Sequence, residues 1–489
     1  MTRGAVRTAL AAIICVVGPF GVLNASQQPP AARVVITHVT IVDVVGGQSH
    51  PDMTVVVSRG HIESITESAR DVSKTGESNE KIVDARGKFL IPGLWDMHTH
   101  MAGINASPTW AKEVLLPLLV ANGITGIRDM GGDLDALLAW RRAIESGQMI
   151  APHIVAGGPM LLPARRPGAT PAPADPSVLR IGSPEEARDS VDSLQKRGAD
   201  FIKIIQLPRD SYFAVAEEAR KDGISFVGHV PPRVTATEAS NAGQKSIEHI
   251  IYSNLAFDCS SKEEDLRKRL LSGNEQEVAD ATDEADRTFS PEKAAALWRT
   301  FLRNDTWVTP TLFSIRANAH HPEDSPTDPL LAFLPAALRK EWLPAATPSK
   351  DDRDTAAWWE RQFANDRRLT REMHRAGVHL LAGSDSLDRY VFVGTSLHEE
   401  LKMLVAAGLT PLEALRASTQ NPTGFLGRKE EGTIARGNVA DLVLLEANPL
   451  EDISNTRRIA AVVLSGRYLS RADLDEMLAK AQSAAIGVH

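Results

Sequence analysis

Two histidines separated by one residue carry the first chemical signal in this chain. His98 and His100 close the run Ile-Pro-Gly-Leu-Trp-Asp-Met-His-Thr-His at residues 91–100. On an extended strand, residues i and i+2 point to the same face, so both imidazoles can reach one point in space. Two imidazoles that converge at a strand end make half of a tetrahedral metal site. The alternative is a pair of surface histidines in a polar turn, unless the rest of the chain supplies further ligands.

Four more side chains of metal-binding type lie in or at the end of apolar runs. Lys203 lies inside Phe-Ile-Lys-Ile-Ile at 201–205, where a lysine is costly to bury unless it is paired or chemically changed. It is either a salt-bridged lysine or one whose amine is carboxylated to a carbamate, which turns a cation into a bridging ligand. His229, His249 and Asp385 each end a short apolar run. Each signal is weak alone, but together with the histidine pair they predict one metal site.

The elements that would position these residues alternate between strand and helix. Candidate strands span 89–100, 124–130, 153–161, 201–205, 225–230, 246–250, 307–312 and 379–385, and helical periodicity occurs at 110–121, 134–146, 184–197 and 355–376. Eight strands with helices between them, over roughly 300 residues, favour an α/β fold of the (β/α)8 TIM-barrel type. An open doubly wound sheet is the alternative, but no GxGxxG follows the first strand.

Short β-branched runs broken by Gly and Asp occur near both chain ends, at 34–57 and 432–466. This pattern is typical of hairpins and predicts one small sheet assembled from both termini.

Three longer segments interrupt the rhythm: a Pro/Ala loop at 163–176, a charged insertion at 259–286 that we expect to be helical, and a Pro-rich stretch at 323–352. Loops that follow barrel strands lie at the face where active sites form, so these segments are candidate lids or surface decoration.

The N-terminus has the pattern of a secretory signal. Arg3 and Arg7 precede an apolar stretch at 9–23, and Ala25 and Ser26 offer a cleavage point. The apolar stretch is short for a membrane span and contains Gly18-Pro19, so we expect no stable span after its removal. The prediction is export to a periplasm or beyond, with residues 1–26 as the signal peptide.

The net charge and the cysteine content exclude some classes of binding partner and some kinds of metal ligand. A formal charge of −8 argues against a nucleic-acid partner, which would require a basic face. Without the signal peptide, Cys259 is the one cysteine left, which excludes an intramolecular disulfide and a multi-thiolate zinc site. A metal would therefore be held by histidine, carboxylate or a modified side chain.

Together these motifs resemble the amidohydrolase superfamily, specifically its imidazolonepropionase- and prolidase-like branch with a binuclear metal centre. The resemblance rests on the run at 83–100, Gly-His-Val at 228–230, Ser-Ile-Glu-His at 246–249, Leu-Leu-Ala-Gly-Ser-Asp at 380–385 and the tail at 408–443. It implies a composite β-sandwich domain built from 31–88 and 425–470 beside a barrel domain at 89–424. A C-terminal helix at 471–489 would follow.

The resemblance also implies a role for each ligand. The more buried metal would be held by His98, His100 and Asp385, the more exposed one by His229 and His249, with carboxylated Lys203 and a hydroxide bridging the two. Nitrogen and oxygen ligands make zinc the expected metal, although Mn²⁺ or Co²⁺ would fit. Two cations lower the pKa of the shared water, and Asp385 would carry its proton to the leaving nitrogen.

Other residues receive lesser roles. Tyr252, three residues after His249, is a candidate substrate contact. Relatives often carry a histidine in the loop after the third strand; this chain has Arg165 and Arg166 there, either of which could meet a substrate carboxylate. Asp96 would at most orient the ligands, Glu248 would be structural because it points away from the face of His249, and His398 would stabilise the last helix.

We therefore expect an exported, metal-dependent amidohydrolase that cleaves the C–N amide bond of a small-molecule substrate, either a dipeptide or an N-acyl amino acid. A cyclic-amide or lactone hydrolase with the same centre is the alternative enzyme. A deaminase is disfavoured, because its mononuclear pattern has no use for Lys203. A non-catalytic metal-binding scaffold would be expected to have lost a ligand, and none is missing. The oligomeric state stays open, a homo-oligomer included.

Overall fold

The computed structural model describes residues 33–68, 80–103, 106–166, 168, 173–319, 329–342 and 349–487. The predicted signal peptide lies outside these residues, as do parts of the loops at 163–176 and 323–352. Within the described ranges, no helix combines the length and the hydropathy needed to cross a membrane.

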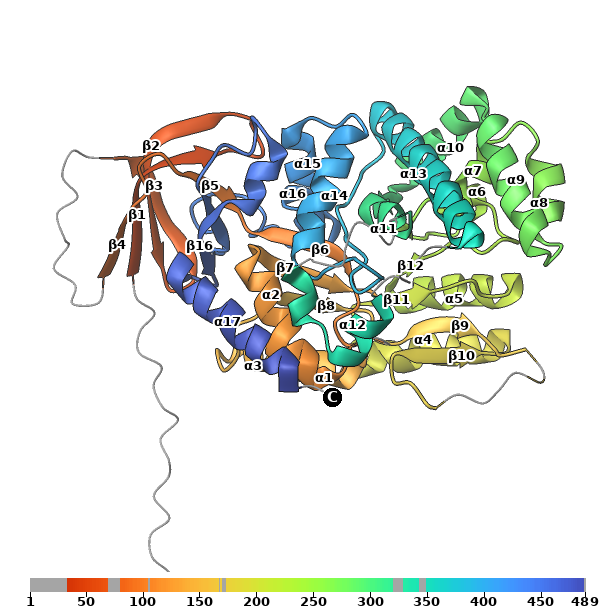
Figure 1. Cartoon of the computed structure of the whole chain (residues 1–489), viewed down its shortest axis with the longest axis horizontal. Helices are drawn as coiled ribbons and strands as arrows, with labels where there is room; N and C mark the ends of the chain where they lie inside the picture. The colour runs from red at the N-terminus through yellow and green to blue at the C-terminus, as the bar shows by residue number, and fades with distance from the viewer. Residues whose placement is uncertain are drawn as a thin grey trace, which may run out of the picture.

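Both chain ends build one eight-stranded sheet, seen at the left of Figure 1. Its strands are β1 (Arg33–Val42), β2 (Ser49–Ser58), β3 (His61–Glu67), β4 (Glu80–Asp84), β5 (Phe89–Pro92), β15 (Leu442–Leu445), β16 (Ile459–Leu464) and β17 (Arg467–Ser470). The order is β17-β16-β15-β5-β1-β2-β3, with β4 paired to β1. The β5–β15 pair joins the N-terminal and C-terminal parts, as the β-branched runs predict. Because the strands connect as one sheet, the β-sandwich form stays a prediction.

Alternate residues of these strands form a core of their own. Val34 and Ile36 of β1, Leu442 and Leu444 of β15, and Val463 of β16 belong to one buried cluster. Successive side chains of a strand point to opposite faces, so every second residue contributes to the buried face. The apolar periodicity of both termini thus specifies a shared core.

The middle of the chain forms two parallel sheets. The first contains β6 (Leu94–Thr99), β7 (Ile124–Asp129) and β8 (His153–Ala156); the second has the order β10-β9-β11-β12-β13-β14 and consists of β9 (Met160–Pro163), β10 (Val178–Ile181), β11 (Phe201–Ile204), β12 (Ser225–Gly228), β13 (Ser246–Glu248) and β14 (Trp307–Thr309). Nearly all residues of the central strands are buried, as expected of parallel strands covered on both faces. The α/β class of the prediction is confirmed.

The predicted strand at 379–385 is not a regular strand, although it is paired on both sides. The Leu381 amide donates to the Val308 carbonyl of β14 (3.0 Å), and the Asp385 amide donates to the His98 carbonyl of β6 (2.8 Å). The first half of the segment hydrogen-bonds to β14 and the second half to β6. Neither set of hydrogen bonds is long enough to define a regular strand. A further bond, from the Asp200 amide to the Ala156 carbonyl (2.8 Å), connects the residue before β11 to β8.

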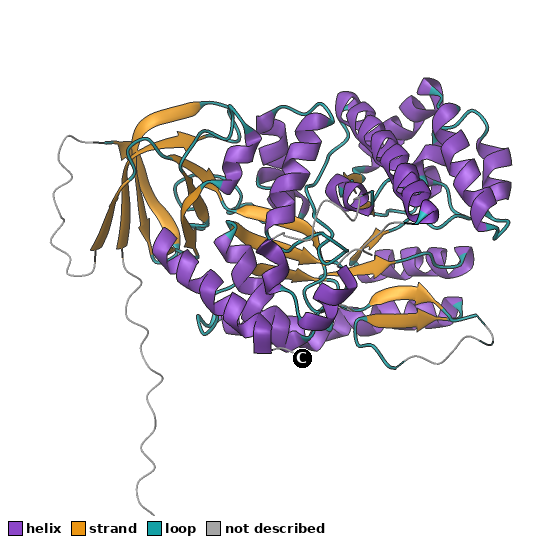
Figure 2. Ribbon diagram, in the orientation of Figure 1, coloured by secondary structure: helices purple, strands orange, loops and turns teal. Residues whose placement is uncertain are grey.

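Helices alternate with the parallel strands and surround them (Figure 2). They are α1 (Pro108–Trp110), η1 (Ala111–Leu115), α2 (Leu116–Ala121), α3 (Leu134–Glu145), α4 (Pro184–Arg197), α5 (Arg209–Asp222), α6 (Ala236–Asn241), α7 (Leu255–Asp258), α8 (Glu263–Leu270), α9 (Glu275–Arg287), α10 (Pro291–Asn304), α11 (Leu312–Asn318), η3 (Pro329–Phe333), α12 (Ala336–Trp342), α13 (Lys350–Ala376), α14 (Thr395–Ala406), α15 (Pro411–Ala417), α16 (Gln420–Phe425), η4 (Ile453–Arg457) and α17 (Arg471–Gly487).

The predicted helices occur where the periodicity placed them. The insertion at 259–286 is helical, as expected, and contains α8 and α9. Helix α13 begins five residues earlier than predicted, because Ser349 and Asp352 form a capping box. Helix α4 matches its prediction, with Ser183 as N-cap and the left-handed Gly198 (φ 95°) at its end.

Candidate metal centre

The predicted ligands line one cavity of about 290 Å³. Its walls contain His98, His100, Met160, Lys203, Ile205, His229, His249, Tyr252, Asp385, Leu387 and Asp388. All six predicted metal ligands and Tyr252 are among them. The cavity therefore unites residues that lie far apart in the sequence, in the way the strand-end pattern predicts.

Each ligand is positioned at or near the carboxyl end of a parallel strand. His98 lies in β6 and His100 directly after it, Lys203 lies in β11, and His229 and His249 directly follow β12 and β13. His249 (φ 59°) and Asp385 (φ 57°) have left-handed backbone conformations. Such conformations are uncommon for residues with a side chain and occur at sites where the surrounding structure fixes them.

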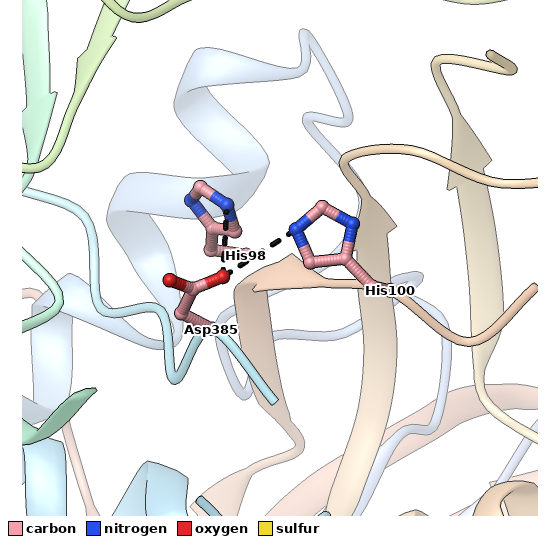
Figure 3. Close-up of side chains that lie close together, drawn as sticks. All are labelled: His98, His100 and Asp385. Carbon is pink, nitrogen blue, oxygen red and sulfur yellow. Dashed lines mark ion pairs between the residues drawn. The ribbon is translucent and has the colours of Figure 1, made fainter. Parts of the chain in front are cut away.

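Three ligand atoms meet at one point of the cavity (Figure 3). The Nε2 atoms of His98 and His100 each lie 3.4 Å from Oδ1 of Asp385. In Figure 3 the carboxylate of Asp385 points between the two imidazole rings. His98, His100 and Asp385 thus form a compact group of nitrogen and oxygen donors suited to a cation.

The other two histidines lie beside this group. The ring of His249 is centred 4.6 Å from that of His98 and 4.9 Å from that of His229. Nδ1 of His249 lies 3.8 Å from Oδ2 of Asp385 and 2.6 Å from the Thr311 hydroxyl. The four imidazoles therefore form a continuous cluster, and three of them, those of His98, His100 and His249, lie within 4 Å of the Asp385 carboxylate.

Several buried polar atoms of this cluster lack a hydrogen-bond partner among the described residues. They are Nε2 of His98, Nζ of Lys203 and Nδ1 of His229. Buried polar atoms in native proteins nearly always have a partner, and an unpaired one costs free energy. Three such atoms in one cavity, together with neighbouring imidazoles and a carboxylate, are a donor set that fits metal ions.

Burial and charge set the protonation states. Burial lowers the pKa of Lys203 to about 8 and that of His249 to about 4. Burial, with Lys203 next in size, lowers the pKa of His98 and His229 well below the ordinary value. For Asp385 burial acts upward, but the neighbouring histidines outweigh it and hold the pKa well below the usual range. His98, His229 and His249 are therefore neutral and Asp385 is ionised near neutral pH, as metal binding requires. For His100, burial acts to lower the pKa, but the hydrogen bond and charge of Asp385 outweigh it and raise the pKa.

Glu248 has a role that the sequence interpretation missed. Its carboxylate accepts a hydrogen bond from His98 Nδ1 (3.0 Å) and pairs with the buried guanidinium of Arg128 on β7 (2.9 Å). The expectation that Glu248 points away from His249 assumed a continuing strand. Strand β13 instead ends at Glu248, and the left-handed backbone of His249 breaks the alternation. The ion pair with Arg128 agrees with the structural role expected of Glu248, and the contact with His98, a predicted metal ligand, adds an orienting role to it.

Asp96 connects the strands that carry the ligands. Its carboxylate accepts bonds from the His98 amide (3.2 Å) and from the Ser384 amide (2.9 Å) and hydroxyl (2.6 Å). Burial raises the pKa of Asp96 to about 6. Asp96 thus fixes the backbone of β6 relative to the segment that carries Asp385, which agrees with the orienting role expected of it.

The remaining candidates separate into those at the cavity and those elsewhere. The ring of Tyr252 stacks on that of His229, with centroids 5.9 Å apart and planes at 9°. Arg165 and Arg166 are exposed and are not among the cavity-lining residues. His398 is buried in α14, where it contacts the Thr456 hydroxyl and the Asn122 carbonyl, as expected of a residue that stabilises a helix.

Arg128 and Asp388 were not identified from the sequence as functional residues. Arg128 is a fully buried arginine in β7, and a charged residue within an apolar run was the available signal. Asp388 lies three residues after Asp385 in a segment without strand periodicity, so no pattern assigns it to the cavity. Burial, followed by the charge of Asp385, raises the pKa of Asp388 to about 7.

Comparison with known proteins agrees with this geometry. Residues 89–469 match the amidohydrolase family. The ochratoxinase of Aspergillus niger is 24% identical over 424 residues, covering 75% of this chain and 72% of that protein. Similar solved structures include a Xaa-Pro dipeptidase with methionine bound in its active site (TM-score 0.65, 19% identity, 90% of this chain and 100% of that one) and bottromycin amidohydrolase (TM-score 0.69, 23% identity, 92% and 90%).

At these identities the solved structures establish a common fold, whereas the family match covers most of the chain. That match spans β6 to β14, the segment at 379–386 and every predicted ligand. The chain therefore belongs to the amidohydrolase family and is a hydrolase that acts on amide bonds.

Proposed function

We propose that this protein is an exported, metal-dependent hydrolase that cleaves the C–N amide bond of a dipeptide or an N-acyl amino acid. The observation that carries the proposal is the convergence of four histidines, one lysine and one aspartate on a single cavity, where three buried nitrogen atoms have no hydrogen-bond partner among the described residues.

A closed (β/α)8 barrel is part of the proposal. The segment at 379–386 hydrogen-bonds to β14 on one side and to β6 on the other, and the bond from Asp200 to Ala156 connects β11 to β8. These contacts connect the two parallel sheets at both places where their edges meet: β6 with β14 through the segment at 379–386, and β8 with β11. In a barrel of this type the carboxyl ends of the strands surround the active site, which supports the same assignment for the cavity.

The ligand set suits two divalent cations. His98, His100 and Asp385 would hold one, His229 and His249 the other, and Lys203 would bridge them as a carbamate. Zinc is the expected metal, with Mn²⁺ and Co²⁺ as alternatives. When bound, such a pair of cations lowers the pKa of a water molecule and polarises a carbonyl oxygen.

The chain's own residues move the protons. Because the pKa of Lys203 is about 8, a fraction of its amines is neutral near neutral pH and can add CO₂, forming an N–C bond and releasing a proton. Asp385 takes a proton from the water whose oxygen bonds to the substrate carbonyl carbon. As the C–N bond breaks, Asp385 gives this proton to the leaving nitrogen. Glu248 keeps the His98 ring oriented through the hydrogen bond to Nδ1.

A hydrolysis screen with metal-reconstituted protein tests the proposal. The panel contains dipeptides, N-acyl amino acids, cyclic amides and lactones, assayed with Zn²⁺, Mn²⁺ and Co²⁺. We expect turnover of the linear amides, and a loss of at least about 10²-fold in kcat for Asp385→Asn with bound metal retained. Turnover confined to cyclic amides or lactones would select the alternative substrate class. Equal inactivity of wild type and Asp385→Asn across the panel would favour a scaffold.

The export part of the proposal is supported by the pattern of residues 1–26. Expression of the full chain in a Gram-negative host, followed by fractionation and N-terminal sequencing, tests it. The expected result is a periplasmic or secreted protein that begins near residue 27. An uncleaved chain in the cytoplasm would contradict it.

A further inference from the structure

One charged side chain of the cavity is not used by the predicted metal centre. Five lining residues remain after the six ligands are set aside, and they are Met160, Ile205, Tyr252, Leu387 and Asp388. Four of them are apolar or aromatic. Asp388 is the fifth. Its carboxylate lines the cavity but is not one of the six predicted metal ligands.

The surroundings of Asp388 provide a hydrogen bond but no counter-charge. Its Oδ2 accepts a bond from the Ser314 hydroxyl (3.1 Å), and none of the ion pairs in the described part of the chain includes this carboxylate. A largely buried carboxylate without a cation is unfavourable, and a bound cation would relieve the cost.

Basic side chains are absent from the rest of the described cavity wall. Among the described residues that line the cavity, Lys203 is the single Lys or Arg, and it is assigned to the metal centre. Arg165 and Arg166, the expected partners of a substrate carboxylate, are exposed and do not line it. The protein side chains that are left for the substrate therefore favour a cation over an anion.

The position of Asp388 relates this preference to the bond that is cleaved. The Ser314 hydroxyl lies 3.1 Å from Oδ2 of Asp388 and 3.5 Å from Oδ2 of Asp385, so one hydroxyl contacts both carboxylates, which are close neighbours. In an aminoacyl amide, one carbon separates the α-ammonium group from the carbonyl carbon. A substrate carbonyl placed beside Asp385 would therefore hold an α-ammonium group close to Asp388.

From these contacts we infer that Asp388 binds the α-ammonium group of the substrate, and that the preferred substrates are dipeptides with a free N-terminus instead of N-acyl amino acids. This inference rests on the proposed amide hydrolysis and selects between the two substrate classes left open there. Met160, Ile205 and Leu387 form an apolar part of the cavity wall, which suits a dipeptide whose N-terminal residue is apolar.

Matched peptide pairs test this inference. L-Leu-L-Ala and N-acetyl-L-Leu-L-Ala contain the same scissile bond and differ in the charge of the amine; Met-Ala, Val-Ala and Leu-Pro extend the set. With wild-type protein loaded with metal, we expect kcat/KM to be at least about tenfold higher for the free peptide than for its acetylated counterpart. Asp388→Asn should reduce this ratio to near one by raising KM of the free peptide, whereas Asp388→Glu, which keeps the charge, should retain much of it.

Two controls separate recognition from damage to the centre. Metal analysis of Asp388→Asn should give the same number of ions per chain as wild type. Asp354→Asn, the same change at an exposed carboxylate of α13 outside the cavity, should keep the wild-type ratio. A wild-type ratio near one, or a ratio unchanged in Asp388→Asn, overturns the inference and leaves amide hydrolysis standing. Failure of metal-loaded wild type to hydrolyse any free or acetylated peptide overturns the inference and the proposed function together.

Discussion

Protonation states at single residues decide what the cavity can bind. Burial lowers the pKa of Lys203 to about 8 and that of His249 to about 4, so both lose their protons more readily than in water. A neutral lysine can react with CO₂, and a neutral imidazole can bind a metal ion. Burial in the fold thus favours the protonation states that the proposed metal binding needs at these two residues.

Lys203 gives the metal-free protein a specific pH dependence. Its pKa is about 8 when folded and 10.5 when unfolded, so the unfolded state binds more protons between these values. Stability therefore rises with pH in that window, and below pH 8 the residue contributes no slope. Relative to Lys203→Met, wild type should gain up to about 3 kcal/mol of unfolding free energy by pH 10.5. Urea unfolding in CO₂-free buffer from pH 7 to 10.5 measures this, and a pH-independent difference would refute the buried, unmodified lysine.

Glu248 supports the centre through His98 and Arg128. Glu248→Gln should weaken metal binding by about 10- to 100-fold, because it removes the charged acceptor that orients the ligand. It should also lower the unfolding free energy by about 3–5 kcal/mol, because Arg128 stays buried without its partner. Isothermal titration with Zn²⁺ and urea unfolding check the two effects. Glu446→Gln, which breaks the partly exposed pair with Lys88, is the control and should cost less than about 1 kcal/mol.

For single residues, the sequence predicts that the six candidate ligands converge, because each follows or interrupts an apolar run, and the structure places all six in one cavity. The contact between Glu248 and His98 could not be predicted, because alternation along the strand stops where the backbone of His249 turns left-handed, and one sequence does not reveal that turn. Asp388 could not be predicted, because its place in the cavity depends on the path of the chain after Asp385.

At the scale of secondary-structure elements, the segment at 379–386 lies close to β6. This close packing sets the distance between Asp385 and His98, two of the predicted ligands. Gly383 faces β6 so closely that an added Cβ would lie 2.7 Å from the Cβ of His98 and 2.9 Å from its backbone nitrogen. A side chain at this position would push apart the two elements that carry His98 and Asp385.

Gly383→Ala should therefore destabilise the fold by about 1–3 kcal/mol and lower the metal content, because overpacking shifts both ligands. Gly424→Ala is the matched control, since nothing lies within 4 Å of a Cβ there, inside α16. That substitution should be neutral or slightly stabilising. Thermal unfolding and metal analysis of both variants check the prediction, and equal behaviour of the two would contradict it.

The sequence predicted most elements but not where two of the strands divide. The stretch at 89–100 divides at Gly93, whose amide donates to the Asp441 carbonyl, so β5 joins the end sheet and β6 the parallel one. The stretch at 153–161 divides at Gly157 and the left-handed Gly158 (φ 69°). In the first case the deciding partner lies near the other end of the chain, beyond the range of local periodicity.

Over the whole molecule, the two chain ends close around the catalytic part. Helix α17 follows the end sheet and packs against α2 and η1 (Figure 1). The ring of His153, at the start of β8, contacts Asp441 beside β15 (2.8 Å), which ties the end sheet to the parallel strands. Residues from both ends therefore contribute to the stability of the cavity-bearing unit.

The contribution of α17 to the free energy of unfolding can be measured by substituting two aliphatic residues of this helix that differ in burial. Leu474 is fully buried, whereas Ile486 is 73% exposed. Leu474→Ala should lower the unfolding free energy by about 2–5 kcal/mol, and Ile486→Ala should change it by less than about 0.5 kcal/mol. Denaturant unfolding measures both. A similar small loss in the two variants would mean that α17 does not stabilise the rest of the chain.

The measurement that tests the central claim most directly is a metal titration followed simultaneously by dipeptide hydrolysis. Metal-free protein is supplied with bicarbonate and increasing Zn²⁺, and bound metal and turnover are recorded for wild type and Lys203→Ala. The account predicts that wild-type activity reaches its plateau at two ions per chain, and that Lys203→Ala binds fewer than two and loses turnover. Full activity with one ion or none, or two ions retained by Lys203→Ala, would contradict the binuclear centre.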